Sequence, residues 1–133
     1  MSHPPIGIDL GTTNSLVGAF VDGKAQLISN TLSDVLTPSV VSIDEDTVLV
    51  GQSAKDRLAT HPQQTASVFK RKMGTGNVTK LARRAFKPED LSSLVLSKLK
   101  SDAEEHLSSQ INDVVVSVPA YFNQTQRQAT RTA

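Results

Sequence analysis

Cysteine is absent from the 133-residue chain, which excludes disulfide bonds and thiolate metal sites. The three histidines, His3, His61 and His106, are isolated and show no metal-ligand spacing. No apolar run approaches the length of a membrane span, and the N-terminus lacks the charged and apolar regions of a signal peptide. These absences predict a cytoplasmic protein that does not contact a membrane.

Excess charge of either sign is also missing. Fourteen Lys and Arg residues against thirteen Asp and Glu residues leave a formal net charge of +1, so no global field indicates nucleic acid as a partner. The content of 38% hydrophobic and 20% charged residues is typical of a soluble globular protein. The length suffices for one domain with a real core.

The run from Ile6 to Ser15 predicts a buried strand that turns sharply at Gly11. Glycine permits φ > 0 in such a turn and lets the backbone approach a ligand closely. The hydroxyls of Thr12 and Thr13 can donate to phosphate oxygens. Asp9, at the strand end, would face a cleft and bind magnesium through water. The alternative is an ordinary polar turn between two strands, because Gly, Asn and Thr are common in turns.

Further strands and helices are predicted along the chain. The expected strands are residues 16–20, 25–29, 40–43, 48–50 and the apolar run 114–118, which we expect to be buried. Asp22-Gly23 indicates a type I′ hairpin turn. Residues 52–59 predict a short helix, and 65–73 a further short helix or turn.

The clearest helix begins at Pro88, a residue favoured at the first helical position. Its apolar stripe consists of Leu91, Leu94, Val95, Leu99, Ala103 and Leu107, and charged residues, Asp102 among them, fall mainly off it. Asn123 and Gln126 predict a capping box that opens a last helix. Because the chain stops at Ala133 inside that helix, we expect a piece of a larger domain.

Two other segments could carry chemistry. Lys70 lies in a basic run before Gly74, where a compact cation could meet a terminal phosphate; a solvated basic turn is the alternative. Pro119 follows the strand run, where a fixed φ could serve as a two-position element. A plain strand-to-helix corner, with Tyr121 packed beneath it, is the alternative there.

Four segments together resemble the DnaK-type chaperones, the seventy-kilodalton heat-shock family. They are residues 8–15, 36–41, 69–74 and 116–130, and the resemblance runs in sequence order over almost the whole chain. It implies an α/β protein with the actin-like ATPase fold, which has a ribonuclease H-like core, of which this chain is the opening part of the first lobe. Residues 1–37 and 112–133 would form the inner subdomain and residues 38–111 the outer one.

The resemblance also implies roles for individual residues, with ATP or ADP and Mg²⁺ as cofactors. Asp9 would hold waters of the magnesium shell. Gly11, Thr12, Thr13 and Asn14 would form the cradle of the β- and γ-phosphates. Lys70 would contact the γ-phosphate and position the hydrolytic water, with Tyr121 nearby, and Pro119 with Arg127 would report the nucleotide state to a substrate-binding domain.

The chain departs from the family pattern between Gly74 and Leu91, where it is short, and in this it resembles the specialised bacterial paralogues of the HscC type. This departure leaves the nucleotide-exchange partner open. Client polypeptides and a J-domain co-chaperone would bind regions beyond Ala133. The fragment alone is expected not to hydrolyse ATP. We also expect it to self-associate, because a truncated domain exposes strand edges and apolar faces. The alternatives are a nucleotide-independent interaction module and, less in keeping with residues 118–123, another actin-like protein.

Overall fold

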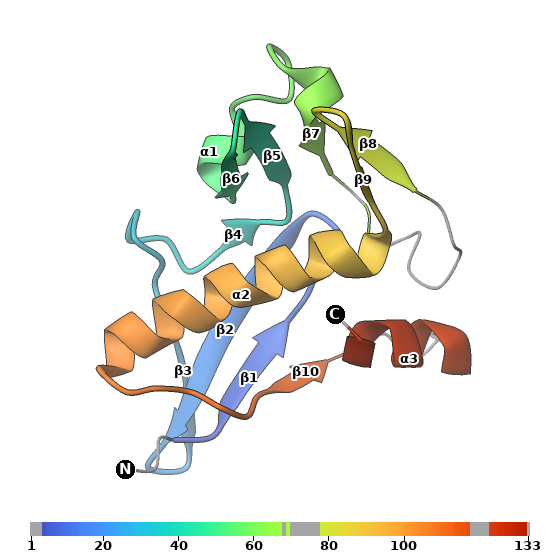
Figure 1. The fold of residues 1–133 in the computed structure, drawn as a ribbon. Helices are drawn as coiled ribbons and strands as arrows, with labels where there is room; N and C mark the ends of the chain where they lie inside the picture. Colours follow the sequence, from blue (N-terminus) through green and yellow to red (C-terminus); the bar gives the residue numbers. More distant parts are fainter. Residues whose placement is uncertain (1–3, 68, 70–77, 118–122, 133) are drawn as a thin grey trace.

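The computed structural model describes residues 4–67, 69, 78–117 and 123–132. Its centre is a sheet with strand order β10-β1-β2-β3, and β4 pairs with β2 (Figure 1). The strands are β1 (Ile6–Asp9), β2 (Asn14–Val21), β3 (Lys24–Leu27), β4 (Thr37–Pro38) and β10 (Val115–Ser117). β10 runs parallel to β1, whereas β1, β2 and β3 are antiparallel neighbours.

The turn between β2 and β3 confirms the predicted hairpin. Asp22 and Gly23 have φ of 52° and 78°, the left-handed conformation that both central residues of a type I′ turn require. The turn fixes the register in which Val21 pairs with Lys24. With this register, alternate residues of β1 and β2 point to opposite faces of the sheet.

One face of the sheet is covered by α2 (Pro88–Leu107), which crosses it diagonally (Figure 1). Proline stands in the first turn as predicted, and the N–H of Lys87 donates to Oδ2 of Asp90 at 2.8 Å. The apolar stripe is confirmed as the buried face of the helix. The core that it forms with the sheet includes Ile6, Ile8, Val17, Ala19, Ile28, Leu91, Val95, Leu99, Ala103 and Ile111.

Asp102 is the exception to the predicted polarity of α2. Its side chain is buried, and Lys98 Nζ lies 2.6 Å from its Oδ1 in an i,i+4 ion pair. The charged partner one turn away offsets part of the cost of burying the carboxylate, while Oδ2 has no hydrogen-bond partner among the described residues.

The opposite face of the sheet has no helix over it among the described residues. Phe20, Leu27 and Val115 are 56%, 53% and 73% exposed there. They line a hollow of about 270 Å³ together with Gly7, Ile8, Asp9, Leu16, Gly18, Ala19, Ala25 and Ser117. The expectation of a buried strand at 114–118 is therefore wrong for this chain. The strand exists, but β10 is an edge strand. Val115 faces the uncovered side, whereas Val116 packs against the core and is only partly buried.

A second sheet, of order β6-β5-β7, lies beyond the end of the central sheet at which β2 begins (Figure 1). It contains β5 (Val41–Asp44), β6 (Thr47–Val50) and β7 (Thr65–Ala66), with α1 (Gln52–Lys55) and the 3₁₀ turn η1 (Pro62–Gln64) between β6 and β7. The predicted strands at 40–43 and 48–50 are confirmed and form the hairpin of β5 and β6, and the predicted helix at 52–59 is shorter than expected. The prediction of helix or turn from residue 65 is wrong at Thr65–Ala66, because these residues pair with β5.

The short hairpin of β8 (Thr79–Leu81) and β9 (Arg84–Phe86) was not predicted from the sequence. Its turn residues, Ala82 and Arg83, have φ of 49° and 73°. Neither residue type favours the left-handed region, so the turn carries no glycine or asparagine signal that a sequence reader would recognise. Tertiary contacts of Leu81 and Phe86 with the core support it.

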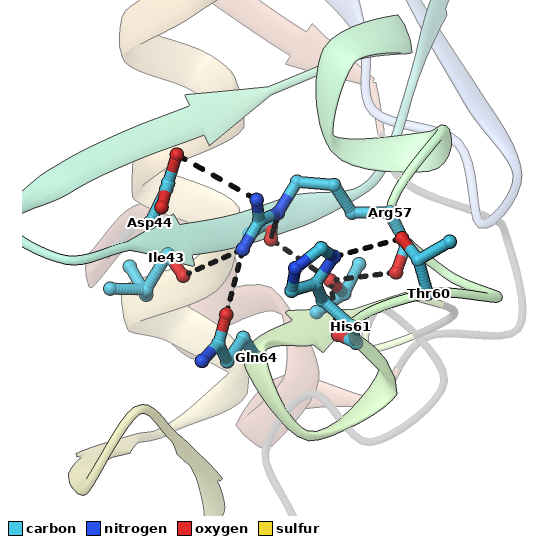
Figure 2. A network of polar contacts seen from close by, with 8 residues as sticks. Ile43, Asp44, Arg57, Thr60, His61 and Gln64 are labelled. Carbon is cyan, nitrogen blue, oxygen red and sulfur yellow. Dashed lines mark hydrogen bonds and ion pairs between the residues drawn. The ribbon is translucent and has the colours of Figure 1, made fainter.

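Arg57 holds the second sheet together through its guanidinium group (Figure 2). Its Nε donates to Ser42 Oγ at 2.7 Å and its Nη2 to Gln64 Oε1 at 2.7 Å, while Nη1 lies 3.7 Å from Asp44 Oδ2. The hydroxyl of Thr65 donates to the carbonyl of His61 at 2.8 Å, which leaves Ser42 to donate to Thr65. These bonds join β5, η1 and β7.

The last helix, α3 (Gln124–Thr132), packs against α2 and begins as predicted. Asn123 Oδ1 accepts from the N–H of Gln126 at 2.8 Å, and Gln126 Oε1 accepts from the N–H of Asn123 at 2.9 Å. This reciprocal pair is the capping box that the sequence indicated. Within the described ranges, neither this helix nor any other is long and apolar enough to cross a membrane.

Candidate phosphate-binding site

The loop between β1 and β2 begins at Gly11 and is so tight that this position has no room for a side chain. A Cβ added to Gly11 would lie 2.0 Å from the carbonyl oxygen of Asn14, which is far inside contact distance. The φ of Gly11 lies outside the left-handed region, so the expected use of φ > 0 is wrong. Glycine is needed here because the two arms of the loop approach each other closely.

Two buried serines brace this loop from beneath. Ser15 Oγ accepts from the N–H of Gly11 at 3.2 Å, and Ser39 Oγ donates to the carbonyl of Gly11 at 2.8 Å. The two hydroxyls lie 2.8 Å apart. Because the single proton of Ser39 goes to Gly11, Ser15 is the donor between them. The three bonds close a ring, and the N–H of Ser39 also donates to the carbonyl of Thr13 at 2.9 Å.

Asp9 stands at the carboxyl end of β1, on the face of the sheet away from α2. Its Oδ1 accepts a hydrogen bond from Ser117 Oγ at 3.2 Å, and the two residues are register partners in the parallel pair β1–β10. The carboxylate is exposed and lines the hollow of the uncovered face. It could therefore carry the waters of a bound magnesium ion, as oxygen ligands at an open edge suit that ion. Among the described residues no group of three metal-ligating side chains occurs.

The hydroxyls of Thr12 and Thr13 are available to donate hydrogen bonds to a ligand. Thr12 is half-buried and Thr13 is exposed, and neither side chain has a hydrogen-bond partner in the part of the chain that the structure describes. Asn14 follows as the first residue of β2 and is paired with Pro38. The loop thus presents free hydroxyl donors, while two of its carbonyls are bound to Ser39. This donor set suits an anion with several oxygens, such as a phosphate group.

Comparisons with known proteins show the family to which the chain belongs. A family model described as Hsp70 protein matches residues 5–85 and 75–133. The chain is 47% identical over 128 residues to the protein named chaperone protein DnaK of Mycoplasma mobile, over 96% of this chain and 21% of that one. The chain belongs to the Hsp70 family. Family membership confirms the predicted resemblance and the actin-like α/β fold, and the chain spans about a fifth of the length of this curated relative.

Several residues with predicted roles in an Hsp70 site fall outside the described residues. Lys70, Tyr121 and Pro119 belong to this group, so their roles stay predictions. Ser117, the last described residue before Pro119 and Tyr121 in the chain, bonds to Asp9. Arg127 is half-buried in the first turns of α3, where its N–H donates to the carbonyl of Asn123 at 3.0 Å.

Ser15, Ser39 and Ser117 were not singled out from the Hsp70 sequence, although each touches the site. A signal was available for Ser15, because strand alternation places it on the same face as Val17 and Ala19. A polar residue on a buried face must find a hydrogen-bond partner there. Ser39 and Ser117 carry no such local signal, since their partners lie 28 and 108 residues away in the chain.

Proposed function

We propose that this segment is the N-terminal part of the ATPase domain of an ATP-dependent molecular chaperone. In the whole protein, ATP binding and hydrolysis would be coupled to the binding and release of client polypeptides. The observation that carries the proposal is the loop Gly11–Asn14, which two buried serines hold and which follows the exposed carboxylate of Asp9 at the end of β1. The 47% identity to a protein named chaperone protein DnaK supports it.

The roles within the site follow the chemistry of each side chain. Thr12 and Thr13 would donate to the β- and γ-phosphates, together with Asn14, and Gly11 lets the loop close. Asp9 would orient the waters of Mg²⁺, which supplies charge neutralisation when bound. Lys70 would contact the γ-phosphate and position the attacking water, with Tyr121 nearby. Pro119 and Arg127 would form the switch toward a substrate-binding domain.

The two sheets support the proposed division of the chain. Residues 1–37 and 112–133 would be the inner subdomain, built on β1, β2, β3 and β10, and residues 38–111 the outer subdomain with the sheet of β5, β6 and β7. α2 packs against β2 and also against β5, β6 and β9, so it joins the two parts. A J-domain co-chaperone would act on the whole protein in the cytoplasm. The HscC-type assignment remains part of this proposal.

The 133-residue chain alone is proposed not to turn over ATP. Phosphoryl transfer depends on positioning and electrostatic stabilisation from all sides of the transferred group, and the loop provides one side. Calorimetric titration of the chain with MgATP should show no binding, or a Kd weaker than on the order of 0.1 mM. Hydrolysis by the pure chain that disappears in Lys70→Ala would contradict this part of the proposal.

The same titration on a full-length protein that carries this segment tests the nucleotide function itself. We expect tight MgATP binding and slow hydrolysis that rises when a client polypeptide and a co-chaperone are added. Absence of any nucleotide binding by the full-length protein would overturn the proposal. That result would favour the alternative of a nucleotide-independent interaction module.

A further inference from the structure

Ser39 contacts both arms of the loop between β1 and β2. Its hydroxyl donates to the carbonyl of Gly11 at 2.8 Å and its backbone N–H to the carbonyl of Thr13 at 2.9 Å. The side chain is 2% exposed, and its neighbour Ser15 is fully buried at 0%. An anion-binding loop must keep carbonyl oxygens away from its ligand, because their partial negative charge would repel phosphate. Ser39 engages two such carbonyls from the buried side.

Ser15 completes the arrangement at the other side of Gly11, on the preceding peptide group. It accepts from the N–H of Gly11 and donates to Ser39, so the N–H and the C=O of Gly11 are both fixed by side chains. A ring of hydrogen bonds without a free donor holds a single orientation better than separate bonds do. The Cβ position of Gly11 lies 2.0 Å from the carbonyl of Asn14, so the loop has little room to relax if the ring is broken.

From this geometry we infer that Ser39, acting through Ser15 and Gly11, is a positioning residue for phosphate binding. The inference rests on the proposed function, because it presupposes that Thr12 and Thr13 receive phosphate oxygens. Ser39 does not touch the ligand. It lies between β4 and β5, so it ties the loop to the first residues of the proposed outer subdomain. Displacement of that segment would move Gly11 with it.

The test measures the affinity of a full-length protein carrying this segment for MgADP, MgATP and adenosine. Ser39→Ala should weaken MgADP and MgATP binding about tenfold, since an unsatisfied buried group costs this much in similar cases. Binding of adenosine, which has no phosphate, should not change. Ser42→Ala is the matched control, because Ser42 is also fully buried and hydrogen-bonded but bonds Thr65 and Arg57 instead of the loop.

A double-mutant cycle separates positioning from general destabilisation. Because Ser15 and Ser39 belong to one ring, Ser15→Ala should cost nearly as much phosphate affinity as Ser39→Ala, and the double variant should cost little more. Fully additive losses, unchanged MgADP affinity in Ser39→Ala, or an equal loss of adenosine affinity would each overturn the inference. If Ser39→Ala does not fold, Ser15→Ala and Ser39→Cys, which keeps a weak donor, are judged by the same criteria.

The outcome also distinguishes this inference from the proposed function. A wild-type protein that does not bind MgADP contradicts the function, and with it the inference. A wild type that binds MgADP, with affinity lost in Thr12→Ala and retained in Ser39→Ala, leaves the proposed function standing and contradicts the role of Ser39 alone.

Discussion

Ser117 Oγ donates to Asp9 Oδ1 at 3.2 Å, joining the carboxyl ends of two parallel strands whose residues are 108 positions apart in the chain. The bond orients the carboxylate of Asp9, which ends β1 just before the loop Gly11–Asn14. An orienting hydroxyl of this kind holds a carboxylate in one rotamer, as the partners around a metal site commonly do. The geometry therefore makes Asp9 the residue to test for magnesium.

In the full-length protein, Asp9→Asn should raise the Mg²⁺ concentration needed for half-maximal ATP binding about tenfold, a typical cost for losing an outer-shell partner of a metal. The amide keeps the size of the side chain but removes its charge. A magnesium titration of ATP binding measures the effect. Asp22→Asn, in the exposed turn between β2 and β3, is the control and should leave the titration unchanged. An unchanged curve in Asp9→Asn would argue against the assignment.

Lys70→Ala in the full-length protein should reduce single-turnover hydrolysis by about a hundredfold or more while MgATP stays bound, because a charge aimed at the transferred phosphoryl group acts mainly in the transition state. Rapid-quench measurement of one turnover and a parallel binding titration separate the two effects. Lys80→Ala, on the exposed side of β8, serves as the control. Hydrolysis at the unmutated rate would remove Lys70 from the proposed site.

Gly11→Ala should destabilise the 133-residue chain by about 1–3 kcal/mol, the usual cost of overpacking. The added methyl group meets the backbone of Asn14, which cannot rotate away as a side chain could. Gly7→Ala is a matched control, because its Cβ would lie 3.9 Å from the nearest atom, the carbonyl oxygen of Val115. Urea denaturation of both variants measures the free energy of unfolding. Equal stability of the two would mean that the loop is more open than described.

Arg57→Ala should lower the free energy of unfolding by about 1–3 kcal/mol, because Ser42 and Gln64 lose their charged donor. Arg57→Lys should restore little, since one ammonium cannot reproduce the fork of a guanidinium. Arg84→Ala, on the exposed β9, should stay within about 0.5 kcal/mol of the wild type. Thermal unfolding followed by circular dichroism compares the three. A loss in Arg84→Ala as large as in Arg57→Ala would contradict the role of this network.

The 133-residue chain should self-associate at high concentration. Its uncovered sheet face carries Phe20, Leu27 and Val115, and both β3 and β10 are edge strands of the central sheet. Light scattering measures the mass, and Val115→Lys should shift it toward the monomer. A monomeric mass of the unsubstituted chain at high concentration would contradict this expectation.

Local sequence signals determined most of the regular structure. Proline at residue 88 and the stripe from Leu91 to Leu107 determined α2, the Asp22-Gly23 pair determined the first hairpin, and Asn123 with Gln126 determined the start of α3. Each of these signals acts through neighbours within a few residues, so it can be read without knowing the rest of the fold. The loop Gly11–Asn14 was also recognisable as a candidate site from its residue types.

Tertiary structure decided what the local pattern leaves open. Thr65–Ala66 became a strand because β5 offered an unpaired edge, and Val115 became exposed because nothing described covers that face of the sheet. The bonds of Ser39 to Gly11 and of Ser117 to Asp9 join residues far apart in the chain. The sequence by itself specified the loop and its donors, whereas the orientation of those donors depends on hydroxyls that only folding brings within hydrogen-bond distance.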